Sequence, residues 1–82
     1  MNKNVLITGS TSGIGLGIAE AFAKNGDNIV FNGLEENGAE IAAEIGTKYG
    51  VKTAFKNSNL MTPEGVQELV DFAYSELGSV DI

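Results

Sequence analysis

Short apolar runs alternate with amphipathic stretches along the whole chain. The runs Val5-Leu6-Ile7 and Ile29-Val30-Phe31 are continuous in apolar residues, which is typical of parallel strands covered on both faces. Between the runs, apolar residues recur at the spacing of a helix face. The pattern predicts strands at residues 3–8, 28–32 and 51–57, helices at about 14–24 and 36–49, a third helix from Thr62-Pro63-Glu64 to Gly78, and a fourth strand that begins at Val80.

The predicted elements follow one another as β-α-β-α-β-α, with a further strand just begun. Right-handed crossovers then give a parallel sheet with strand order 3-2-1 and helices on both faces. The third strand is more polar than the first two, so we expect it at an edge of the sheet. This is an α/β, Rossmann-like architecture in which residues 1–82 form the N-terminal half of a dinucleotide-binding domain. We expect the domain to be incomplete, because the half of the sheet on the far side of the first strand is missing.

Glycine, proline and threonine mark the helix boundaries. Gly26 and Gly50 follow the first two helices as left-handed caps or stops, and Thr62 with Pro63 is a strong start for the third. Gly46 falls inside the second helix and is expected to weaken it by about 1 kcal/mol relative to alanine. In the third helix an apolar stripe predicts a packing surface or an interface; it consists of Val66, Leu69, Val70, Ala73 and Leu77.

The stretch Thr8-Gly9-Ser10-Thr11-Ser12-Gly13-Ile14-Gly15 joins the first strand to the first helix. A Walker-type loop needs four residues between its glycines and then a lysine, whereas three residues separate Gly9 from Gly13. The pattern G-x-G-x-x-G fails because Ile18 stands where its last glycine should be. What remains is Thr-Gly-x-x-x-Gly-Ile-Gly, in which the free amides at the helix start can bind an anion. The alternative is an ordinary glycine-rich turn between a strand and a helix.

The amino-acid composition excludes several kinds of site and partner. The chain has no cysteine and no histidine, which excludes disulfides and thiolate metal sites and removes the commonest general base. Five basic residues against eleven acids give a net charge of −6, which argues against nucleic acid or an anionic membrane as a partner. A bound phosphate would therefore be held by backbone dipoles. We find no apolar run near the roughly 20 residues of a membrane span and no signal-peptide core, and we expect a soluble, cytoplasmic protein.

The eight-residue glycine stretch resembles the cofactor motif of the short-chain dehydrogenase/reductase family, and the resemblance extends over the whole chain. Within the family, residues 9–19 and 29–33 look most like the bacterial D-3-hydroxybutyrate dehydrogenases. The resemblance implies a hydride-transferring enzyme that uses NAD. It also implies the site: a turn formed by Gly9, Gly13 and Gly15, a pyrophosphate facing Ser12 and the amide of Ile14, and an adenosine ribose reached by Ser10.

The segment after the second strand bears on the choice of cofactor. It reads Asn32-Gly33-Leu34-Glu35-Glu36, with no basic residue to hold the 2′-phosphate of NADP, and its acids would repel one. We therefore expect NAD, with Gly33 and Leu34 beside its adenosine half. Glu35 or Glu36 could serve the ribose hydroxyl, or could equally be a solvated acid of the second helix. After the third strand the family has Asp before an aliphatic residue, contacting adenine. Here Asn59-Leu60 stands there, with Asn59 either a neutral adenine contact or an ordinary loop-capping amide.

The family's catalytic residues, an Asn-Asn-Ala-Gly segment, a Ser and a Tyr-x-x-x-Lys pair, have no counterpart in residues 1–82. Tyr49 is followed by Lys52 at the wrong spacing, and no lysine follows Tyr74. We therefore expect the NAD-binding part of an oxidoreductase acting on a secondary alcohol such as 3-hydroxybutyrate, inactive by itself because it is a fragment, a truncation or a shortened form. The alternative is a non-catalytic nucleotide-binding or self-associating module. The exposed edge of the first strand and the third-helix stripe predict a homo-oligomer in either case.

Overall fold

The computed structural model describes residues 3–11, 13–34, 36–57 and 62–82. Within these residues strands and helices alternate as the sequence predicts: β1 (Asn4–Ile7), α1 (Gly13–Lys24), β2 (Asn28–Asn32), α2 (Gly38–Tyr49), β3 (Thr53–Lys56) and α3 (Pro63–Leu77). The second strand has its predicted bounds. The second helix begins two residues later than predicted, which leaves Glu36 in the turn before it.

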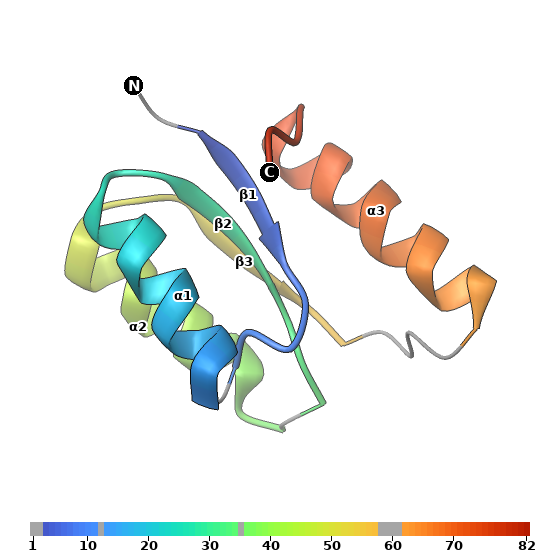
Figure 1. The fold of residues 1–82 in the computed structure, drawn as a ribbon, viewed down its shortest axis with the longest axis horizontal. Helices are drawn as coiled ribbons and strands as arrows, with labels where there is room; N and C mark the ends of the chain where they lie inside the picture. Colours follow the sequence, from blue (N-terminus) through green and yellow to red (C-terminus); the bar gives the residue numbers. More distant parts are fainter. Residues whose placement is uncertain (1–2, 12, 35, 58–61) are drawn as a thin grey trace.

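The strands form a parallel sheet with β2 in the centre (Figure 1). Asn4 lies opposite Asn28, and Ile29 lies opposite Thr53. The order β1-β2-β3 is the predicted 3-2-1 read from the other edge, and β3 lies at an edge as its polar composition indicates.

The last residues of the chain lie along the edge of β1 that faces away from β2 (Figure 1). The amide of Leu6 donates to the carbonyl of Ile82 at 2.8 Å, and the amide of Ile82 donates to the carbonyl of Asn4 at 3.3 Å. This pair of bonds is the pattern of a parallel ladder in which Ile82 faces Val5. The amide of Asp81 also donates to the Asn4 carbonyl, at 2.8 Å. Within the described residues the sheet has three strands, so the predicted fourth strand is not formed, but the chain end covers part of an edge of β1 that the sequence suggested was open.

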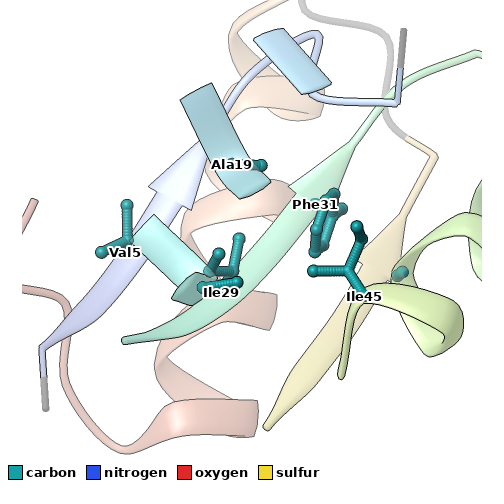
Figure 2. Packing of buried hydrophobic residues seen from close by; sticks show 7 residues of the cluster. Val5, Ala19, Ile29, Phe31 and Ile45 are labelled. Atoms are coloured by element: carbon teal, nitrogen blue, oxygen red, sulfur yellow. The ribbon is translucent and has the colours of Figure 1, made fainter. Parts of the chain in front are cut away.

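Helices cover both faces of the sheet, α1 and α2 on one side and α3 on the other (Figure 1). Because successive strand residues point to opposite faces, Ile29 and Phe31 pack toward α1 and α2 while Val30 packs toward α3. Figure 2 shows the first of these layers, in which the labelled side chains are Val5, Ala19, Ile29, Phe31 and Ile45. These layers fix the strand ends relative to the helices.

The third helix uses its predicted stripe mainly for packing. Leu69 and Ala73 are buried against Val30, whereas Val66 near the helix start stays 44% exposed. Its ends match the sequence signals: Thr62 Oγ1 accepts a bond from the Gly65 amide at 3.0 Å, with proline at the first helical position. Among the described residues, no helix combines the length and apolar character needed to cross a membrane.

A polar contact joins α1 to α2 on the outer surface. Glu20 accepts a hydrogen bond from the Tyr49 hydroxyl at 2.7 Å and pairs with Lys48 Nζ at 3.1 Å. The pKa of Glu20 is held below its ordinary value, mostly by the hydrogen bond from Tyr49 and next by the interaction with Lys48. The bond to Glu20 in turn raises the pKa of Lys48. The tyrosine is thus engaged in a contact between helices.

Candidate functional site

The carboxyl ends of β1, β2 and β3 lie at one edge of the sheet because the strands are parallel. In open α/β sheets ligands bind in the crevice outside this edge. Two predicted segments, residues 8–15 and 33–34, follow β1 and β2 there. The third, Asn59 and Leu60, lies outside the described residues, as do Ser12 and Glu35.

The chain after β1 makes the tight turn that the sequence predicts. Gly9 and Gly13 adopt φ values of +59° and +56°, a region in which side chains are strained. Both residues are exposed, and α1 begins at Gly13. Ile14, in the first turn of the helix, is 84% exposed. The helix start is therefore open to solvent, where a ligand can reach it.

Gly15 lets α1 approach this turn closely. A Cβ atom at this position would lie 2.0 Å from the Gly9 carbonyl oxygen and 2.8 Å from its carbon. No side chain fits at these distances, so the helix start could not lie against the turn with any other residue at position 15. The three glycines of the motif thus have separate tasks: two bend the chain and the third permits the contact.

The charge distribution at the start of α1 suits an anion. The first turn of α1 contains no acidic residue, whereas α2 and α3 carry Glu40 and Glu64 there. An acid in the first turn interacts favourably with the helix dipole and would repel an anion, so its absence from α1 favours an anion there. Residues 8–15 also contain no basic side chain, so within this stretch only backbone amides could attract one.

Ser10 has a different position from the one predicted. Its side chain is fully buried, and its hydroxyl donates to the Ile7 carbonyl at 2.7 Å while accepting from the Asn32 amide at 2.9 Å. The Ser10 amide also donates to the Asn32 carbonyl, at 2.7 Å. Because the chain turns back toward the sheet directly after Gly9, this hydroxyl supports the turn from within. We therefore reassign Ser10 from the ribose contact to the support of the turn.

Asn32, which the sequence reasoning did not single out, is the second support. Its side chain is 3% exposed and bonds the Gly9 amide and the Lys56 carbonyl, so it joins the ends of all three strands. The available signal was a polar residue that ends an otherwise apolar strand. Of the two residues that follow Asn32, Gly33 is buried. Leu34 is 74% exposed, so its apolar side chain lies in solvent close to Asn32 in the chain.

Metal-binding groups do not gather in the described part of the chain. The Tyr49 hydroxyl donates a hydrogen bond to Glu20 between α1 and α2. In residues 3–11, 13–34, 36–57 and 62–82, no group of three or more histidine, cysteine or acidic side chains could hold a metal ion.

Residues 3–82 match the family described as short chain dehydrogenase. Over 80 residues the chain is 36% identical to the D-beta-hydroxybutyrate dehydrogenase of Cupriavidus necator. The aligned region covers 98% of this chain and 31% of that protein.

Two solved structures are also similar. The L-sorbose reductase of Gluconobacter frateurii, complexed with NADPH and L-sorbose, has a TM-score of 0.90 and 41% identity over 98% of this chain and 31% of its own. The alcohol dehydrogenase of Thermococcus sibiricus, complexed with 5-hydroxy-NADP, has a TM-score of 0.91 and 29% identity over 99% of this chain and 35% of its own. The chain spans about a third of the length of these relatives.

Proposed function

Because the chain belongs to the short-chain dehydrogenase family, we propose that its glycine turn binds the diphosphate of a nicotinamide dinucleotide. The observation that carries this proposal is the joint geometry of the turn and α1. Two exposed glycines with positive φ lead into a helix whose first turn holds no acid, and Gly15 brings that helix against the turn. A solvent-exposed helix start reached through glycines is suited to a diphosphate.

The proposed contacts follow the motif. Ser12 and the amide of Ile14 face the diphosphate, while Gly9, Gly13 and Gly15 shape the turn. Gly33 and Leu34 lie beside the adenosine half, and Asn59 with Leu60 takes the adenine. These 82 residues supply the first half of the dinucleotide-binding domain. When bound, the nicotinamide supplies the hydride acceptor or donor, and this half orients the dinucleotide through its main chain.

We propose NAD as the cofactor. Two similar structures hold NADPH or an NADP derivative, so a phosphorylated cofactor occurs among the relatives. In this chain, however, no lysine or arginine occurs in residues 32–36, and two acids stand at positions 35 and 36. A 2′-phosphate would meet negative charge without a cation to balance it. We expect the full-length protein to bind NADH at least about tenfold more tightly than NADPH, a difference of about 1.4 kcal/mol.

The proposed reaction is hydride transfer between NAD and a secondary alcohol such as 3-hydroxybutyrate. The similarity to D-beta-hydroxybutyrate dehydrogenase supports this substrate class. No catalytic residue is proposed within residues 1–82; the catalytic Ser, Tyr and Lys would come from the longer protein. Formation of NADH with D-3-hydroxybutyrate, compared with other secondary alcohols, tests the substrate directly.

A paired substitution tests dinucleotide binding. Gly13→Val places a branched side chain at φ +56° in the turn, and Gly50→Val places one at φ +68° after α2, where nothing lies within 4 Å of a Cβ. Both changes strain the backbone by about 1–2 kcal/mol, but only the first lies in the proposed site. We expect Gly13→Val to abolish NADH binding in the full-length protein and Gly50→Val to retain it. Equal binding by two folded variants would refute the assignment; if either is unfolded, the alanine pair serves.

A second candidate is a nucleotide-binding or self-associating module, and a homo-oligomer is proposed with either function. The edge of β1 and the α3 stripe support self-association less than the sequence suggested, since both are partly covered. An apolar face on α1 supports it better: Ile14 and Ile18 are 84% and 46% exposed, and a shallow hollow is lined by Ile18, Ala21, Phe22 and Asn25. A sedimentation coefficient of a monomer, unchanged with concentration, would contradict the oligomer.

A further inference from the structure

The carboxamide of Asn32 connects the turn after β1 with the end of β3. Its Oδ1 accepts the amide proton of Gly9 at 3.2 Å, and its Nδ2 donates to the Lys56 carbonyl at 3.1 Å. The backbone of Asn32 also bonds Ser10 through its amide and its carbonyl, so the central strand contacts the turn through side chain and main chain together. One residue thus holds three strand ends in a fixed relation.

The orientation of this carboxamide is set by its partners. A backbone amide can only donate and a backbone carbonyl can only accept, so the oxygen must face Gly9 and the nitrogen must face Lys56. With 3% of Asn32 exposed, its side chain is directed into the protein. Asn32 can therefore affect a bound ligand only indirectly, through the position of the backbone groups to which it is hydrogen-bonded.

Gly9 is fixed from two sides. Its amide is held by Asn32, and its carbonyl oxygen lies against Gly15 at the start of α1. We propose that Asn32 is a positioning residue of the dinucleotide site: by fixing Gly9 at φ +59°, it sets the direction in which the turn delivers the first amides of α1 to the diphosphate. This inference rests on the proposed function.

The opposite edge of the sheet supplies a matched control. There Asn28 Nδ2 donates to Asn4 Oδ1 at 3.1 Å, and Asn28 Oδ1 accepts from the Lys52 amide at 3.0 Å. The carboxamide of Asn28 thus also makes one donor and one acceptor bond across the same strands, in a more exposed position away from the glycine turn. Substituting it removes two cross-strand bonds without touching the proposed site.

The experiment measures NADH affinity and unfolding for three variants of the full-length protein. Asn32→Leu removes both side-chain bonds, Asn32→Asp keeps an acceptor for Gly9 but loses the donor to Lys56, and Asn28→Leu is the control. Because an unpaired carboxylate is costly to bury, Asn32→Asp should be less stable than Asn32→Leu. We expect the dissociation constant to rise about tenfold in Asn32→Leu and to stay within about threefold in the Asn28→Leu control. In Asn32→Asp, which keeps the acceptor for Gly9, the rise should be smaller than in Asn32→Leu. The KM for the nucleotide should rise in Asn32→Leu with little change in kcat, and its Gly9 amide should exchange faster.

The results separate the possible failures. If the unmodified protein does not bind NADH, the proposed function fails. If the protein binds NADH but affinity follows stability across the variants, or Asn32→Leu binds normally, the positioning role is overturned. If Asn32→Leu does not fold, the smaller Asn32→Ala, which also removes both side-chain bonds, replaces it: an about tenfold loss of affinity supports the role, and normal affinity overturns it.

Discussion

Substituting Gly15 tests whether close contact between α1 and the turn builds the site. In Gly15→Ala the new methyl carbon would lie 2.0 Å from the Gly9 carbonyl oxygen, against the minimum of about 3 Å that real Cβ atoms keep. The obstacle is backbone, which cannot rotate away, so the start of α1 has to retreat by roughly 1 Å. Such overpacking costs about 3 kcal/mol, offset by about 1 kcal/mol from the better helix propensity of alanine.

Gly17 provides the control for this change. It lies two residues further along the same helix, and a Cβ there would meet nothing within 4 Å. Gly17→Ala should therefore stabilise the full-length protein by about 0.5–1 kcal/mol, whereas Gly15→Ala should destabilise it by about 2 kcal/mol. Urea unfolding of both variants measures the difference, and titration with NADH should show weaker binding for Gly15→Ala alone. The reasoning is refuted if the two variants agree in stability within about 0.5 kcal/mol.

Two further predictions concern the supporting structure. Thr62→Ala removes the side-chain oxygen that accepts the Gly65 amide and should cost about 1 kcal/mol, measured by urea unfolding; Thr62→Ser should restore most of it. Because the pKa of Glu20 is held below its ordinary 4.5, its pairing contributes to stability above that pH and is lost as the pH falls through the lowered value. Tyr49→Phe removes the largest cause and should raise the pKa of Glu20 toward 4.5 in an NMR titration; an unchanged pKa would contradict the assignment.

Local patterns predicted the elements and the glycine turn well. The bounds of β2, the Thr62 cap and the left-handed Gly78 follow from properties of single residues and their near neighbours. These features depend on interactions between residues within a few positions of one another, so the sequence alone is enough to predict them.

Local sequence patterns did not predict the roles of residues that contact partners far away in the sequence. Ser10 reads as a polar loop residue, and only the approach of Asn32, 22 positions away, shows that its hydroxyl is buried. Gly46 was expected only to weaken α2, yet a Cβ there would lie 2.6 Å from Thr53 Oγ1, so glycine permits the helix to meet β3. A single sequence does not state which residues will meet across the sheet.

The cross-strand bonds of Asn28 with Asn4, of Lys52 with Asn28 and of Asn32 with Lys56 all span 24 positions. Because the entropy of closing a loop depends on its length, the two crossovers carry similar costs. Each new strand can also join the edge left by its predecessor, in the order in which the ribosome releases the chain. The contact of the Asn4 amide with the Asp81 carboxylate spans 77 positions and therefore closes a much longer loop than either crossover.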